Sequence, residues 1–470
     1  DATSLVVGAV IGADIYVVAS LGAGFLGPAM LVAWVIAGVV AGLIALSFAR
    51  CAALVPRTGG SYAYARQAFG NMAGFLTGWA LYLAELVSIA IFPSAFVRYL
   101  AFLVPGLTTW QSIAAKAGFV AFLVATNIIG TRGTGRVNDL LTVGKLGPLL
   151  LLILLGFAFA GSRPASVAAN LTPFAPLGWA GLGQAIILAF WAYAGFELAV
   201  LPAGEVRDSR RTLPKAMALG MAIATAFYLL VNAVVTAAVP WQVLAQSTAP
   251  LAIALQTMLA LLLAGSGAWL GGVVMSVGAI LSISGADESA MLGTSRLSYA
   301  MAADGYLPRF FAHLHPRFGT PYLAVILQGA VALAASIAGS FTGLIQLAVF
   351  LLSLAYAATS LAAARLSQRQ PEPRWHTARA RALTLLAAGG AAYLLTQAPR
   401  EAYVLGAAFL TVGLLAYALA APKQARAEIL ERLLARERRL AEMKRALAVA
   451  PARALQGLRT LFDRGKAPPV

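Results

Sequence analysis

The sequence predicts an all-α polytopic membrane protein with twelve transmembrane helices, and three observations lead to this fold class. Hydrophobic residues make up 60% of the 470 residues and charged residues only 11%, whereas soluble domains carry about 25% charged residues. Apolar runs near the roughly 20 residues that cross a bilayer recur from Leu5 to Ala420. Lysine and arginine gather in alternate loops, a pattern typical of loops that face two compartments.

The apolar runs place the spans along the chain. The first run is expected to be a span and not a cleavable signal peptide, because it leads directly into further spans. Residues 1–421 form the predicted transmembrane domain, and residues 422–470 form a basic cytoplasmic tail. The twelve spans are predicted at residues 4–26, 28–49, 72–103, 112–129, 138–160, 181–203, 213–239, 267–302, 322–339, 342–364, 381–397 and 401–420.

The loops differ strongly in charge. By the positive-inside rule the basic loops are cytoplasmic, which predicts a multi-pass protein of the inner (plasma) membrane with both termini cytoplasmic. The same topology accounts for the formal net charge of +17, so nucleic acid is not a predicted partner. The opposite loops hold little beyond Lys116, Arg163 and Arg400. The basic set is Arg50, Arg57, Arg66, Arg132, Arg136, Arg207, Arg210, Arg211, Lys215, Arg309, Arg317 and the stretch from Arg365 to Arg381.

The tail from Pro422 to Ala450 has the pattern of an amphipathic helix. One stripe is apolar and the opposite face carries many arginines and glutamates. An interfacial helix on anionic lipid is the first interpretation. A homodimer contact through a coiled coil is the alternative, although Arg436 interrupts the stripe at a core position.

The residues that bind metals or form covalent intermediates are scarce. Cys51 is the only cysteine, and the histidines His313, His315 and His376 fall in predicted loops. Zinc and disulfide chemistry therefore lack ligands within the spans. No phosphate loop, nucleophile elbow or HExxH motif is present. The sequence predicts neither an enzyme nor a cofactor.

Two spans contain flexible or polar residues where a membrane helix should be most regular. The first has Gly8, Gly12, Ala13 and Asp14, and the sixth has the run from Ala194 to Glu197. Such interruptions tend to line a cavity. Because the two spans lie five apart, we expect two inverted five-helix repeats, about 1–160 and 181–366, followed by extra helices at 381–420.

Several ionisable residues lie inside predicted spans. An acid at the centre of a lipid-facing helix costs about 3 kcal/mol, so five would cost about 15 kcal/mol, comparable with the whole stability of a typical fold. These acids must therefore face water, a partner or a substrate. Ser88 lies one turn from Glu85 and faces the same cavity by helical spacing. The acids are Asp14, Glu85, Glu197, Asp287 and Glu288, and the one base well inside a span is Lys145.

Four ordered motifs resemble those of the amino acid, polyamine and organocation (APC) permeases, and the resemblance covers most of the chain. The resemblance implies ten core helices in a five-plus-five inverted (LeuT-like) repeat, two further helices and alternating access around a central site. The motifs are GAVIGADIY at 8–16, PRTGGSYAYARQAFG at 56–70, the stretch 190–216 around FWAYAGFELAV, and the stretch 278–321 that ends in DGYLPRFFAHLHPRFGTP.

Asp14 departs from the family's pattern. In the family the first-helix break usually reads glycine, small, glycine, and its bare amides hold the substrate carboxylate. Here Ile11, Gly12 and Ala13 are followed by Asp14, which stands in place of the second glycine. A carboxylate at this point attracts a substrate ammonium group and repels a carboxylate, unless it is protonated or paired with Lys145. A structural ion pair and a solvated vestibule acid are the alternatives.

The sixth-helix motif implies aromatic contacts with the substrate. Trp191 matches a tryptophan that stacks on the substrate in an antiporter of this family, and a desolvated cation over an indole gains about 1–2 kcal/mol. An interfacial or packing tryptophan is the alternative. Tyr193, Ala194, Gly195 and Phe196 form the break and would close over a ligand. The motif's acid, Glu197, is predicted to be a proton-sensitive gate.

Lys145 resembles a fifth-helix lysine of proton-coupled members, whose ammonium group occupies the place of a second sodium ion. Burial lowers a lysine pKa, so the group can load and release a proton during the cycle. Ser282 and Ser284 match positions that face it, and Asp287 or Glu288 one turn later is predicted to pair with it or with substrate. A stem that snorkels to the cytoplasmic surface is the alternative.

The resulting functional hypothesis is a proton-coupled secondary transporter for a small amine or amino acid that reaches Asp14 and Trp191. A channel or carrier for an inorganic cation is the alternative, since five intramembrane acids offer oxygen ligands. Soft transition metals would need Cys, His or Met ligands, which the spans lack apart from scattered methionines.

Overall fold

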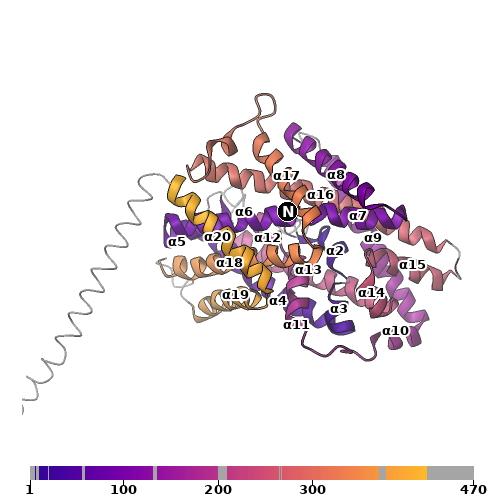
Figure 1. The fold of residues 1–470 in the computed structure, drawn as a ribbon. Coiled ribbons are helices and arrows are strands. Elements are labelled where there is room, and N and C mark those ends of the chain that lie inside the picture. Colours follow the sequence, from indigo (N-terminus) through magenta and orange to yellow (C-terminus); the bar gives the residue numbers. More distant parts are fainter. Residues whose placement is uncertain are drawn as a thin grey trace, which may run out of the picture.

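The computed structural model describes residues 6, 10–19, 21–55, 59–130, 135–199, 209–263, 265, 267–369 and 377–420. Within these ranges the side chains at 17, 135–145, 198–199, 209–211 and 420 are not described. The tail at 422–470, Gly8, and the charged loop residues Arg57, Arg132, Arg207 and His376 lie outside the described residues. Every regular element in the described part is a helix (Figure 1).

The helices follow one another with short connections. The first part of the chain forms α2 (Asp14–Val18), α3 (Ala23–Leu26), η1 (Gly27–Ala29), α4 (Met30–Leu54), α5 (Gly60–Phe69), α6 (Asn71–Ile89), α7 (Phe92–Leu103), α8 (Thr109–Ile129) and α9 (Gly135–Ser162). The second part forms α10 (Pro164–Leu171), α11 (Leu182–Trp191), α12 (Phe196–Ala199), α13 (Ser209–Ala238), α14 (Trp241–Gln246), α15 (Pro250–Leu262), α16 (Ala268–Ala303), η2 (Arg309–Ala312), α17 (Tyr322–Ala338), α18 (Phe341–Gln368), α19 (Ala378–Thr396) and α20 (Arg400–Ala420).

Helices occupy the predicted spans, which confirms a polytopic helical membrane protein. In the described part, seven helices are long and apolar enough to cross a membrane, or eight if α9 and α10, bent by 103°, form one span. The number twelve stays a prediction. The span expected at 72–103 is interrupted at Ala90 and Ile91, where Pro93 near the start of α7 cannot donate to the preceding turn. The short helices α5, α10, α14 and α15 lie in segments that the apolar runs left as loops.

Both expected interruptions are present. In the sixth span, α11 ends at Trp191, residues 192–195 form turns and α12 begins at Phe196. Gly195 has φ 105°, a conformation that residues with a Cβ rarely adopt. In the first span, residues 11–13 are not helical and α2 begins at Asp14. The breaks expected near Gly12 to Asp14 and Ala194 to Phe196 are therefore confirmed.

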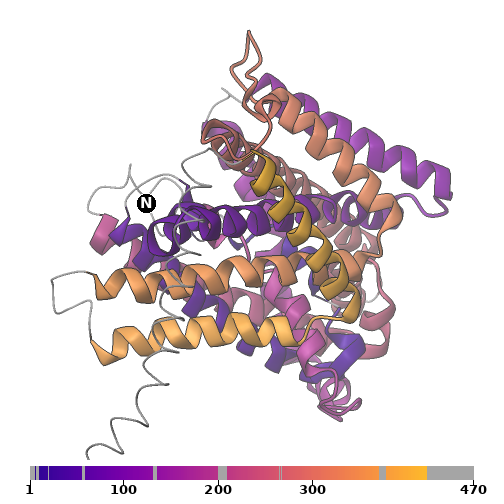
Figure 2. The ribbon, with the colours of Figure 1, turned by 60° about the vertical axis from the view of Figure 1, so that its left-hand side comes forward.

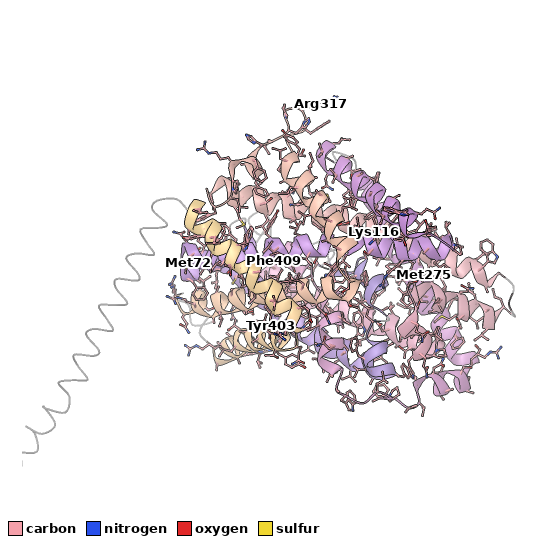
Figure 3. All side chains as sticks on the ribbon, in the orientation of Figure 1. Met72, Lys116, Met275, Arg317, Tyr403 and Phe409 are labelled. Carbon is pink, nitrogen blue, oxygen red and sulfur yellow. The ribbon has the colours of Figure 1, made fainter. Side chains whose placement is uncertain are left out.

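The helices pair closely around these interrupted segments. The helix α4 packs along α13, and α6 packs along α18. Figure 2 shows α18 and α19, both orange, lying side by side, while α8 and α17 form another pair at the edge of the molecule. The final described helix, α20, crosses α6 and α18, where the Trp79 indole donates to the carbonyl of Phe409 at 2.8 Å. Figure 3 shows Tyr403 and Phe409 along this helix.

Glycine allows the closest of these contacts. A Cβ added at Gly156 on α9 would lie 2.4 Å from the Cβ of Val234 on α13. Membrane helices associate through such small residues because lipid provides no hydrophobic force between them. The contact matters for function because α13 carries Tyr228, a residue that reaches both interrupted helices.

We expect Gly156→Ala to lower thermal stability, because the added methyl group has to push α9 and α13 apart. Overpacking of this kind costs about 1–3 kcal/mol. Gly118→Ala on α8 is the matched control, since nothing lies within 4 Å of the position that its added methyl group would take. Thermal unfolding of the detergent-solubilised protein measures both. Equal melting temperatures for the two variants would contradict the close α9–α13 contact.

Candidate functional site

A single tyrosine hydroxyl joins the two interrupted helices. Tyr228, fully buried on α13, has its Oη 2.6 Å from the carbonyl oxygen of Val10 and 3.0 Å from that of Ala192. These carbonyls belong to the breaks of the first and sixth spans. A peptide group that leaves its helix in a dry interior needs another partner. Tyr228 supplies it and thereby fixes the two breaks to each other. The helices α2, α12 and α13 all lie in the middle part of the bundle as seen in Figure 1.

An aromatic cluster covers the same junction. The rings of Trp34, Tyr193 and Tyr228 lie 5.2–5.9 Å apart in edge-to-face contacts, a favoured geometry for aromatic pairs. The Tyr193 hydroxyl also donates to the carbonyl of Trp34 at 3.1 Å. Tyr193 is therefore anchored to α4.

The predicted aromatic and polar residues of spans three and six meet. The Trp191 indole donates to the Ser88 hydroxyl at 3.2 Å, and its ring lies 5.6 Å from that of Phe92. Only 2% of Trp191 is exposed. The indole is thus fully packed in this conformation. The structure brings Ser88 and Trp191 together, while a stacking role for Trp191 stays a prediction.

Two predicted acids face each other across spans three and six. Glu85 on α6 and Glu197 on α12 are buried and interact directly through their side chains. The backbone N–H of Gly195 donates to Oε2 of Glu197 at 3.0 Å, so the break itself orients this carboxyl group. Asp14 is near enough to Glu85 to interact electrostatically. Three acids from distant parts of the sequence therefore gather beside the breaks.

Asp287 is the most isolated of the predicted acids. Its side chain is fully buried on α16, and neither carboxyl oxygen has a hydrogen-bond partner among the described side chains, which do not include Lys145. Native proteins rarely leave a buried polar group in this state without a ligand or a functional reason. The neighbouring Glu288 is half-buried on the adjoining face. The Asp287 side chain therefore suits a proton or a cationic group.

The residues predicted for coupling are only partly described. Lys145 lies in α9, but its side chain is outside the described residues, so its contacts with Ser282 and Ser284 stay a prediction. Ser282 is buried, and its hydroxyl has no partner among the described side chains, whereas Ser284 donates to the carbonyl of Ile280 at 2.8 Å. Of the two serines, Ser282 therefore has the hydroxyl group that can still bond to another residue.

The remaining predicted residues line the breaks or the core behind them. Ile11 and Ala13 are buried, while Ala194 is half-buried. Phe196 packs with ring distances of 5.5 Å to Phe48 and 5.3 Å to Tyr356. Its ring therefore belongs to a core aromatic cluster.

Sequence reasoning missed the residues that hold this site together. These residues are Tyr228 on α13, Trp34 on α4 and Tyr356 on α18. All three lie within predicted apolar spans, where aromatic residues are common and do not stand out. A tyrosine in mid-span is a usable signal, because its hydroxyl needs a partner that hydrocarbon cannot provide. The partner of such a hydroxyl depends on how the helices pack, and the neighbouring sequence does not predict it.

The described residues contain no group of three or more Asp, Glu, His or Cys side chains that could hold a metal ion. Glu85 contacts Glu197 directly and Asp14 only through space, so these acids do not form a closed oxygen shell of the kind that divalent cations prefer.

Comparison with known proteins places this geometry in context. The family model for amino acid permeases matches residues 1–425. An uncharacterized transporter of Mycobacterium tuberculosis is 31% identical over 419 residues, which cover 89% of this chain and 89% of that protein. The branched-chain amino acid permease of Bacillus subtilis is 28% identical, covering 79% and 81% of the two chains. The serine/threonine exchanger of that organism is 31% identical, covering 76% and 79%.

We expect Tyr228→Phe to loosen the junction between the breaks, because the carbonyls of Val10 and Ala192 lose their shared donor. Leaving buried acceptors unpaired costs about 1–3 kcal/mol. Tyr403→Phe is the control, since its hydroxyl also donates to a carbonyl, that of Leu395, at the exposed periphery. The measurement is thermal stability together with hydrogen exchange at residues 192–195. Unchanged exchange there would contradict the bridging role of Tyr228.

Proposed function

The chain belongs to the amino acid permease family, and on this premise we propose a secondary active transporter that moves a small amino acid or amine by alternating access, coupled to protons. Family membership makes the protein a transporter and not an enzyme. The proposal adds the substrate class, the coupling ion and the arrangement of the spans. It includes insertion in the inner (plasma) membrane with both termini cytoplasmic.

The observation that carries this proposal is the junction of the two interrupted helices. Breaks at corresponding positions of two repeats free peptide groups near the midplane, where transporters bind substrate and coupling ion. Here the breaks face each other through Tyr228 and are flanked by Asp14, Glu85 and Glu197. We further propose that the chain crosses the membrane twelve times and that ten of the spans form two inverted repeats of five helices.

The charge around the junction supports a substrate that carries an ammonium group. Glu85 and Asp287 are buried acids and Asp14 is a half-buried one beside them, so a cationic group gains most by approaching these residues. Two relatives are named for branched-chain amino acids and for serine and threonine. A small amino acid, or its amine, fits both observations. The proposed binding residues are Ile11, Gly12, Ala13, Asp14, Glu85, Ser88, Trp191, Tyr193, Ala194, Gly195, Phe196, Asp287 and Glu288.

Asp14 makes the substrate class testable. Two desolvated carboxylates a few ångströms apart repel by several kcal/mol at an effective dielectric constant near 20. If Asp14 stands where a substrate carboxylate would lie, an amine should compete for the site at least as well as its parent amino acid. Asp14→Gly should then shift the preference toward the amino acid by about tenfold or more, or about 1.4 kcal/mol.

Competition binding on the purified protein decides the point, with Glu401→Gln on α20 as a remote control. An amino acid that wins clearly on the wild type, with the same ranking in Asp14→Gly, would mean that Asp14 does not replace the substrate carboxylate. Stabilisation by inorganic cations alone, with neither organic ligand bound, would favour a cation carrier instead.

Proton coupling is tested at Lys145. We expect Lys145→Ala to abolish uptake driven by a pH gradient in proteoliposomes while substrate exchange continues, because the proposed proton carrier is lost. Lys116→Ala is the matched control: this lysine on α8 donates to the Ser336 carbonyl, away from the breaks. Wild-type uptake that requires sodium and ignores the pH gradient would reject the coupling.

A further inference from the structure

A small pocket lies between α5, α6, α12 and α16, next to the sixth-span break. It encloses about 20 Å³ and is lined by Ser61, Glu85, Glu197 and Thr294 together with the glycines at 59 and 60. One buried water molecule requires about 10–15 Å³ and two to four polar partners. The pocket is therefore the size of one water molecule and far smaller than an amino acid site.

Three polar atoms at this pocket have no hydrogen-bond donor or acceptor within range among the described residues. They are the hydroxyl oxygens of Ser61 and Thr294 and Oε1 of Glu197, on residues that are 0%, 1% and 2% exposed. Buried polar atoms are nearly always paired with protein or with ordered water. The free hydroxyls of Ser61 and Thr294, beside a carboxyl oxygen and a space of this size, suit a small polar ligand such as water.

The two carboxyl groups of the pocket cannot both be ionised in this arrangement. Glu85 and Glu197 interact directly, and among the described residues no cation is found beside either of them; Arg66 of the neighbouring α5 pairs with Asp304 instead. An ionised carboxylate only accepts hydrogen bonds, so two carboxyl groups that bond to each other need one proton between them. The Gly195 N–H already bonds Oε2 of Glu197, which helps it to act as the charged partner.

The geometry points to a proton-loading site in which Glu85 and Glu197 share one proton, and a water molecule in the pocket passes it toward Ser61 and Thr294. This inference rests on the proposed function and adds Glu85, Ser61 and Thr294 to its coupling machinery. Release moves the proton from the carboxyl pair through the water and the hydroxyls to bulk solvent at the α5 end, which restores the neutral water and leaves both glutamates ionised. The pair then carries one more negative charge, which a substrate ammonium group or entering solvent can compensate.

Few other described titratable groups lie close enough to influence the protonation of Glu85 and Glu197. Asp14 from α2 and Tyr356 from α18 are the titratable groups that the described part sets against the pair. The pocket residues from α5 and α16 are uncharged. Arg66 of α5 instead bonds Asp304 at 2.9 Å. The α5 end of the pocket adjoins the loop that the positive-inside rule assigns to the cytoplasm, which sets the direction of release.

Infrared spectroscopy of the purified full-length protein tests the shared proton without relying on transport. Between about pH 5 and pH 9, the wild type should show a titrating carboxylic-acid C=O band. Glu85→Gln and Glu197→Gln should each remove it, because either carboxylate left alone accepts a hydrogen bond from the new amide. Asp287→Asn should retain the band. Loss in only one glutamine variant, or in neither, would overturn the sharing of one proton.

The relay is tested by Thr294→Val in proteoliposomes, with Thr384→Val on α19 as the matched control. Uptake driven by a pH gradient should fall about tenfold, the rate equivalent of one lost hydrogen bond, while substrate exchange and the Thr384→Val variant stay at wild-type levels. Equal loss of exchange, or no change in driven uptake, would overturn the relay. If the wild type takes up no amino acid or amine, the proposed function fails while the infrared result still decides the proton site.

Discussion

The hydrogen-bonding needs of the backbone constrain the rest of this structure. In hydrocarbon an unpaired peptide group costs several kcal/mol, so a membrane helix is interrupted only where other groups replace its lost bonds. At the sixth-span break, turn bonds pair the amides of residues 192–194, the Glu197 side chain accepts from Gly195 N–H, and Tyr228 contacts the carbonyl of Ala192. The same hydroxyl contacts Val10. Satisfying the backbone therefore brings together the two segments on which transport is proposed to depend.

Charge is the second constraint, and it follows from the first. The groups that replace backbone bonds include carboxyl groups, and the site gathers the buried Glu85 and Glu197 with the half-buried Asp14. Such a cluster persists only if protons or cations compensate it. A transporter can use that requirement, because a proton and a substrate ammonium group then compete for, or jointly satisfy, the same negative charge. Binding of one necessarily changes the affinity for the other.

The sequence predicted the long helices well, because length and hydropathy are what a bilayer selects. It also located both breaks, since glycine and acids stand out in an apolar run. It missed α5, α14 and α15, which are short and not set by bilayer thickness. It placed Glu85 with the substrate residues and Glu197 with the coupling residues, whereas the structure pairs them. Such a pairing depends on how α6 and α12 are rotated, which local pattern does not record.

The conformation described here has the central residues closed off, which bears on how substrate reaches them. Trp191, Tyr193 and Asp287 are 2%, 0% and 0% exposed, so helices must move before an amino acid can contact them. On the α5 side, Asp304 accepts from Tyr62 at 2.6 Å and from Arg66 at 2.9 Å. Both partners of that ion pair are 42% exposed, and exposed pairs contribute only about 0–1 kcal/mol. The ion pair itself therefore adds little, but Tyr62 is only 5% exposed, so separating α5 from the end of α16 also breaks a hydrogen bond of a buried donor. The α5 contact ends on a carboxylate that is 42% exposed and that water can solvate, whereas Tyr228 is fully buried against two carbonyls. Of the two contacts, the junction at Tyr228 is therefore the costlier to break.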